Sequence, residues 1–210
     1  MKKLFTAIRK CDLDNVKTIL EKSPNLISCV STGAPKKDEG QSPLQVALKA
    51  SSSEIINYLL DMGADINFME SADYGNPWRA PVIHDAINRA IMCSRWNLTR
   101  PDGLEIFSTE EAANESFEIL KRVISLGANL NAKDSFGNAC LDRACLQARQ
   151  ILPSANSNDR VLTEELKSDI SRIFKLLINN GADLNYIKPN GTGKTYTEDY
   201  GAETLGMFLK

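Results

Sequence analysis

The chain has 210 residues, of which 42% are hydrophobic and 25% charged, with a formal net charge of −2 and an isoelectric point near 5.6. These values are ordinary for a globular protein. The lack of a basic excess argues against a general binder of nucleic acid or membrane surfaces. No apolar run approaches the roughly 18 residues that a membrane-spanning helix needs. Because no signal peptide is recognisable, we expect a cytoplasmic protein, or one delivered to a host cytosol without such a signal.

Residues 1–30 are expected to form an N-terminal cap. Apolar residues recur at spacings of three and four around Leu4 and again around Val16, which predicts two amphipathic helices. Asp12 is placed to begin the second helix, and Pro24 to end it. Residues 31–40, which are rich in Gly, Pro and charge, are expected to form a loop.

A short tail occurs three times in the chain: GADIN at residues 63–67, GANLN at 127–131 and GADLN at 181–185. Each tail follows an apolar helical segment, and the first closes a stretch at residues 40–67 that reads as two short helices joined by a tight turn. Self-similarity of this kind predicts an architecture of stacked repeats.

The stretch SPLQVAL at residues 42–48, together with the three tails, resembles the ankyrin repeat. The resemblance implies an all-α fold, an ankyrin-repeat α-solenoid of stacked helix-turn-helix units with β-turn fingers, and a single domain over residues 1–210. It also implies that Ala47 is small because the helices of neighbouring repeats approach closely there. The expected division is an N-terminal cap at 1–30, a regular repeat at 38–70, longer repeats at 71–133 and 134–187, and a C-terminal cap at 188–210.

The two longer repeats contain insertions. The tail glycines are 64 residues apart from 63 to 127 and 54 apart from 127 to 181, against about 33 for a plain ankyrin repeat. The surplus lies near residues 90–115 and 147–168, at the turn between paired helices in both units. We expect loops at residues 96–103 and 153–160, each followed by a long helix. The first of these helices should start at a capping box of Ser108 and Glu111 and end near Ser125.

No feature of the sequence predicts catalysis, a cofactor or a metal. Residues 191–195, GTGKT, look like the end of a phosphate-binding loop, but Lys188 stands where the first glycine is required, which favours a turn. The five cysteines have no CxxC spacing and there is one histidine, so we expect reduced thiols and no zinc site. The resemblance implies that His84 joins repeats by hydrogen bonding to backbone, with Asp142 in the equivalent place.

The resemblance implies a non-enzymatic protein–protein interaction module, expected as a monomer, that binds another protein through its concave face and finger tips. Aromatic and arginine side chains are the types that dominate interface hot spots. Carrying the family's contact positions onto this chain gives Tyr74, Trp78, Arg79, Asn88, Arg89, Ser135, Phe136, Asn138 and Gln147. An alternative for Trp78 is that its side chain covers the apolar surface of its own finger.

A second hypothesis is a small-ligand binder or enzyme that uses a pocket formed by the two inserts. Its site would be assembled from Trp96, Arg100, Asp102 and residues near 149–160. Trp96 could instead pack under its own loop. A deep polar pocket containing a perturbed carboxylate would favour this hypothesis, whereas an open, aromatic-lined concave face would favour the binding module.

Overall fold

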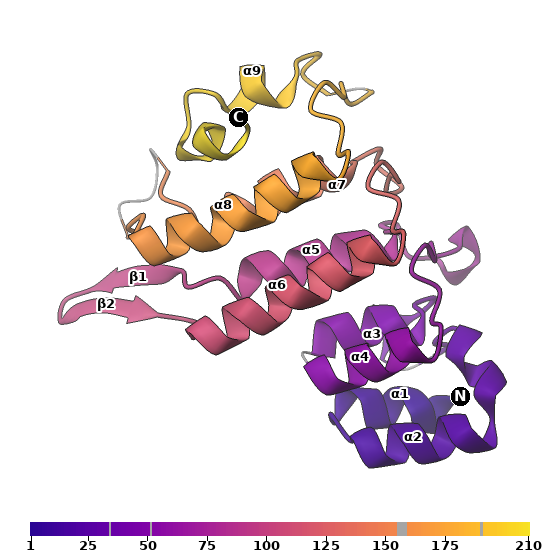
Figure 1. The fold of residues 1–210 in the computed structure, drawn as a ribbon. Coiled ribbons are helices and arrows are strands. Elements are labelled where there is room, and N and C mark those ends of the chain that lie inside the picture. Colours follow the sequence, from indigo (N-terminus) through magenta and orange to yellow (C-terminus); the bar gives the residue numbers. More distant parts are fainter. Residues whose placement is uncertain (34, 51, 155–158, 190) are drawn as a thin grey trace.

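The computed structural model describes residues 1–33, 35–50, 52–154, 159–189 and 191–210, and this part of the chain is predominantly helical (Figure 1). Its helices are α1 Lys2–Arg9, α2 Leu13–Lys22, α3 Pro43–Ala50, α4 Ser53–Asp61, α5 Val82–Met92, α6 Glu110–Ser125, α7 Cys140–Ala148, α8 Glu164–Asn179 and α9 Tyr196–Tyr200. Strands β1 Asn97–Arg100 and β2 Gly103–Ile106 lie between α5 and α6. Short 3-10 helices cover Pro24–Ser28, Lys36–Asp38, Ala72–Tyr74 and Thr204–Phe208.

The first eight helices form consecutive pairs that follow one another from the N-terminus to the C-terminus (Figure 1). Helices α1, α3, α5 and α7 pack in succession, and α2, α4, α6 and α8 form a second row alongside them. Ala47, Ala86 and Ala144 lie at matching places on α3, α5 and α7, and all three are fully buried. Small side chains at these places let neighbouring helices approach closely, which is the role that the ankyrin resemblance implied for Ala47.

Helix ends follow local signals in the sequence. Asp12 is the N-cap of α2, and its carboxylate accepts a hydrogen bond from the Asn15 amide. The capping box expected at Ser108 lies one residue too early, because Thr109 is the N-cap of α6 and the Ser108 hydroxyl donates to the Cys93 carbonyl at 2.6 Å. Helix α6 ends at Ser125, as predicted.

The recurring tails contact one another through asparagine side chains. Asn67 donates from Nδ2 to the Gly127 carbonyl (3.2 Å) and accepts at Oδ1 from the Asn129 amide (2.8 Å). Asn131 repeats this arrangement with the next tail, donating to the Gly181 carbonyl and accepting from the amide two residues later. The tails are therefore hydrogen-bonded in succession along one side of the molecule.

The segment expected to be a loop at residues 96–103 is instead part of an antiparallel hairpin, so the expectation of a purely α-helical fold is wrong here. Arg100 pairs with Gly103 across a two-residue turn of Pro101 and Asp102. Gly103 has a φ of 134°, a conformation in which a side chain would be strained. The second expected loop, at residues 153–160, includes residues 155–158, which lie outside the described part of the chain.

The C-terminal segment covers the last helix pair. Leu205, Phe208 and Leu209 are buried, and the Phe208 ring lies 6.0 Å from that of Phe174 on α8. Met207, in the same segment, is exposed. Asn190, at the start of the predicted turn, lies outside the described residues.

Candidate functional site

Two loops that project from the helix pairs are hydrogen-bonded to each other; we call them the third finger (residues 70–81) and the fourth finger (residues 132–139). The Arg79 amide donates to Ser135 Oγ at 3.1 Å, and the Ser135 amide donates to the Arg79 carbonyl at 2.9 Å. Ser135 Oγ also donates to the Pro77 carbonyl at 3.0 Å. These bonds hold the two fingers in one fixed arrangement.

The Trp78 side chain crosses from the third finger to the fourth. Its indole Nε1 donates to Asp134 Oδ2 at 2.8 Å, and the residue is half-buried. The Arg143 guanidinium on α7 lies 5.0 Å from the ring centroid and the Lys49 ammonium on α3 lies 6.0 Å from it, within cation–π range. Trp78 therefore links the two fingers, rather than covering only its own finger.

Asp134 organises the fourth finger. Its carboxylate accepts hydrogen bonds from the amides of Phe136 and Asn138 and from Asn138 Nδ2, in addition to that from Trp78. Burial raises the pKa of Asp134, but the hydrogen bonds from Asn138, Trp78 and the backbone outweigh it, so the pKa lies below its ordinary value. The carboxylate is consequently ionised at neutral pH and fixes the backbone from which Phe136 projects.

A groove of about 660 Å³ lies between the fourth finger, α7 and the segment around residue 188; we call it the finger recess. Phe136 is 57% exposed and Leu146 is 39% exposed at its wall. Lys188 Nζ donates to Asn138 Oδ1 at 2.6 Å, and the Tyr186 hydroxyl donates to the Gly137 carbonyl at 2.7 Å. The residues that line the recess are Ser135, Phe136, Gly137, Asn138, Leu146, Lys188 and Pro189.

The structure brings some of the predicted contact residues together. Ser135, Phe136 and Asn138 line the finger recess, and Trp78 and Arg79 adjoin it through the bonds between fingers. Tyr74 lies elsewhere on the third finger, with its ring against Gly40.

Three of the predicted contact side chains are buried within the chain's own fold, including Asn138, which borders the recess but is only 5% exposed. Arg89 donates to the Leu48 carbonyl and to Ser53 Oγ, which ties α5 to α3 and α4. Gln147 is buried and donates to Gln150, and Asn138 is buried beneath Asp134. Asn88, on α5, is half-buried.

Leu146 and Lys188 are residues of the recess that the sequence reasoning missed. Leu146 lies in α7 three residues after Arg143, so an exposed apolar side chain on a polar helix face was a usable signal. Lys188 could not be found in the same way, because it reaches the recess from a segment about fifty residues later in the chain, and no local pattern predicts that contact.

Two neighbouring ionisable side chains, His84 and Asp85, are buried beneath the third finger. The His84 imidazole lies beside the Ala132 backbone and Asp134 of the next unit, and burial lowers its pKa to about 4. Burial raises the pKa of Asp85 to about 6, although Lys49 Nζ lies 3.5 Å from its carboxylate. Burial against the next unit is the environment of a structural histidine.

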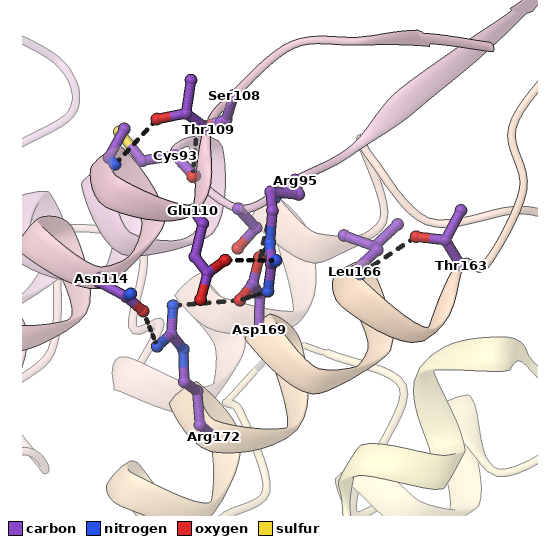
Figure 2. Close-up of polar contacts among 12 residues, drawn as sticks. Cys93, Arg95, Ser108, Thr109, Glu110, Asn114, Thr163, Leu166, Asp169 and Arg172 are labelled. Carbon is purple, nitrogen blue, oxygen red and sulfur yellow. Dashed lines mark hydrogen bonds and ion pairs between the residues drawn. The ribbon is translucent and has the colours of Figure 1, made fainter.

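The two inserts are joined by hydrogen bonds between β1 and residues 159–161, and a buried carboxylate on α8, shown in Figure 2, anchors the base of the hairpin. Asp169 on α8 accepts from Arg95 Nε (2.9 Å), Arg95 Nη2 (3.0 Å) and the Arg95 amide (3.0 Å). Arg172 Nη2 lies 3.1 Å from the same carboxylate, and Arg172 Nη1 donates to Asn114 on α6. This network fixes the base of the hairpin to the helix that follows the second insert.

The residues proposed for a pocket between the inserts are spread along the hairpin. Trp96 stacks on Phe107 at the base, with ring centroids 4.2 Å apart. Arg100 and Asp102 are exposed at the tip, where Arg100 pairs with Glu105 at 2.7 Å. This arrangement does not favour the hypothesis of a small-ligand site that uses these three side chains together.

The described residues contain neither a metal-binding cluster nor a membrane-spanning helix. In these ranges, no group of three or more His, Cys, Asp or Glu side chains is arranged to hold a metal ion. No helix among the same residues has both the length and the apolar character needed to cross a membrane.

Comparison with known proteins finds one family. No curated protein matches the chain. The family model for the ankyrin repeat matches residues 39–68. The matched segment contains α3, α4 and the first tail, so this part of the chain is similar to an ankyrin repeat, a unit that generally mediates protein–protein interactions.

Proposed function

We propose that the chain is a short ankyrin-repeat solenoid and a non-enzymatic module that binds another protein through the finger recess and Trp78. The match at residues 39–68 supports the family, and the hydrogen-bonded tails support a regular stack. In this proposal the caps are residues 1–30 and 188–210, the regular repeat is 38–70, and the repeats with inserts are 71–133 and 134–187. The module acts as a monomer in the cytoplasm.

The observation that carries the proposal is the exposure of Phe136. A phenylalanine that is 57% exposed on a loop held by four hydrogen bonds to one carboxylate is a rigid apolar anchor. Rigid aromatic side chains contribute strongly to binding because little conformational entropy is lost when they are covered. The adjacent groove, with Leu146 at its wall, provides space for a side chain of the partner.

The charges around this surface indicate the chemistry of the partner. Arg143 flanks the Trp78 ring together with Lys49, which also pairs with Asp85, and Lys188 lines the recess. The carboxylate of Asp134 is occupied by hydrogen bonds from its own finger and from Trp78. A partner segment that combines an apolar side chain with acidic neighbours would complement this surface. Binding should accordingly weaken as salt is raised, because exposed charge pairs are screened.

The experiment that tests the proposal compares Phe136→Ala with Leu126→Ala. Both side chains are exposed apolar groups, but Leu126 lies at the end of α6, outside the recess. Tagged wild type and the two variants would capture proteins from native lysate, and the affinity of each captured protein would be measured by calorimetry. We expect Phe136→Ala to weaken binding at least about tenfold, as for a hot-spot residue, and Leu126→Ala to leave it unchanged.

Phe136 is preferred to Trp78 as the test position, because removing the Trp78 indole would also break its bond to Asp134 and alter the finger. A partner that bound wild type and Phe136→Ala equally would show that the recess is not the binding surface. Failure to capture any protein from several lysates would contradict the binding module itself.

A further inference from the structure

The hairpin between α5 and α6 has two backbone edges, and the hydrogen bonds show which amides lie on each edge. The Phe107 amide donates to the Trp96 carbonyl within the hairpin, and the register pairs Leu98 with Glu105. Hydrogen-bonded and non-bonded pairs alternate in an antiparallel ladder. The amides and carbonyls of Leu104 and Ile106 therefore point outward, away from β1.

The β1 edge is already covered by the chain itself. The Thr99 amide donates to the Asp159 carbonyl at 2.6 Å, as the alternation requires. Asn97 Nδ2 donates to the Val161 carbonyl at 2.8 Å, and the Val161 amide donates to Asn97 Oδ1 at 2.9 Å. One edge of the hairpin thus receives residues 159–161, with bonds from backbone and side chain.

The β2 edge is open to solvent. All four residues of β2 are exposed, and the hairpin projects beyond the ends of the helices in Figure 1. Leu104 is 44% exposed and Ile106 is 59% exposed, on one face of the strand. Glu105 faces the other side, where it pairs with Arg100. Natural proteins usually protect such edges with lysine, proline or a covering segment, yet β2 carries exposed apolar side chains.

We propose that the outer edge of β2 binds an extended segment of another protein, which adds a strand to the hairpin. The outward amides and carbonyls require an occupant in the β conformation. Apolar side chains of the occupant would lie opposite Leu104 and Ile106. A basic side chain between them would lie opposite Glu105, which is about half exposed and can accept a second cation.

A second copy of this chain fits the edge less well. The antiparallel pairing with fullest overlap places Leu104 opposite Ile106 of the copy, but it also places Glu105 opposite the same glutamate. Like charges directly opposite one another destabilise a strand pair. The edge is also distinct from the finger recess, so this inference does not depend on the function proposed above.

The test uses a fluorescein-labelled peptide, Gly-Ser-Val-Arg-Val-Thr-Gly, and a second peptide with Glu in place of Arg. Anisotropy titrations would measure the binding of each to the full chain. We expect wild type to prefer the Arg peptide about threefold, and Glu105→Lys to reverse that preference, from the strength of opposed charge pairs. Ile106→Pro removes an outward amide without removing a bond of the hairpin, and should weaken binding about fivefold.

Control measurements show whether the peptides bind at this edge of a folded protein. Leu126→Ala should bind both peptides as wild type does, because its exposed side chain lies at the C-terminal end of α6, outside the recess and at the end of the helix remote from β2. Circular dichroism and tryptophan fluorescence, which reports Trp78 and Trp96 together, should show that each variant keeps the fold and the stacked base of the hairpin. Amide exchange by NMR should show that the Arg peptide protects the amides of Leu104 and Ile106.

Three results would overturn the inference. The first is no binding of either peptide up to about 1 mM, the weak limit of specific recognition. The second is an unchanged preference in Glu105→Lys, or protection of amides elsewhere in the chain. The third is concentration-dependent dimerisation of wild type that Ile106→Pro abolishes, which would assign the edge to a second copy.

Discussion

The adjacent residues His84 and Asp85 should make the free energy of unfolding depend on pH in two opposite ways that nearly cancel. His84 has a folded pKa of about 4 against 6.5 in the unfolded chain, so the unfolded state binds its proton first. The stabilising contribution of this residue is complete when the pH lies above 6.5, its pKa in the unfolded chain, and is lost as the pH falls from 6.5 towards 4. Asp85 has a folded pKa of about 6 against 3.8. Its stabilising contribution is complete below 3.8 and is lost as pH rises through 6.

The magnitudes follow from the two pKa pairs. On going from about pH 7 to about pH 5, His84 should lower the free energy of unfolding by about 1.8 kcal/mol, and Asp85 should raise it by about 1.3 kcal/mol. Over this interval the pair should therefore lower the free energy of unfolding of wild type by only about 0.5 kcal/mol. Both side chains are buried, so solvent screening reduces these values little.

Two variants separate the contributions. Asp85→Asn keeps the histidine, so its free energy of unfolding should fall by about 1.3 kcal/mol more than that of wild type over the same pH interval. His84→Gln keeps the aspartate and introduces the residue found at the equivalent place in α3, where Gln45 donates to the Ala80 carbonyl. Between about pH 7 and about pH 5, the change in its free energy of unfolding should therefore be about 1.8 kcal/mol more favourable than the change in wild type.

Urea unfolding at a series of pH values would measure these differences. Burial raises the pKa of Glu70, and the charge of Asp85 raises it further, so Asp85→Asn and its reference would both be measured in a Glu70→Gln background. The reasoning would be refuted if Asp85→Asn followed the pH profile of wild type, because Asp85 would then be ionised in the folded protein throughout the interval. Equal slopes for His84→Gln and wild type would likewise refute burial of a neutral imidazole.

Two further predictions concern the anchor of the inserts and the thiols. Asp169→Ala should lower the free energy of unfolding by about 3 kcal/mol in urea titrations, because Arg95 and Arg172 lose a shared, buried acceptor; a loss below about 1 kcal/mol would mean that the network contributes little. In native protein, Cys11 should react readily with a thiol reagent because it is exposed, whereas Cys140 should react only after unfolding, since burial raises its pKa to about 12. Equal reaction rates for the two thiols would contradict that burial.

The features predicted correctly from sequence are those with local causes. The Asp12 cap depends on residues within one helical turn, and the end of α6 at Ser125 directly precedes a tail of the repeat. The helix pairs follow from apolar spacing. The hairpin also had a local signal, because Leu104 and Ile106 alternate with polar residues beyond the turn at Pro101 and Asp102. That turn was interpreted as part of a longer loop, which hid the alternation.

The candidate site was predicted only in part, because its contacts join distant segments. Residue types and finger positions were enough to select Trp78 and Phe136. The bond between Trp78 and Asp134 spans 56 residues, and Lys188 reaches Asn138 across 50. Whether a polar side chain on a first helix is exposed also depends on the neighbouring unit, which is why Arg89 was wrongly placed on the surface. Such contacts have no sequence periodicity that could reveal them.

The asparagine bonds between successive tails have a consequence for how this chain tolerates change in length. Asn67 and Asn131 make the same pair of bonds although the units they join differ by ten residues. The distance between neighbouring units is therefore set at the tail end of each helix pair, while the number of residues at the opposite end differs between the two units. Residues can be added or removed at the hairpin end without moving the fingers, so the β2 edge and the finger recess can diverge independently.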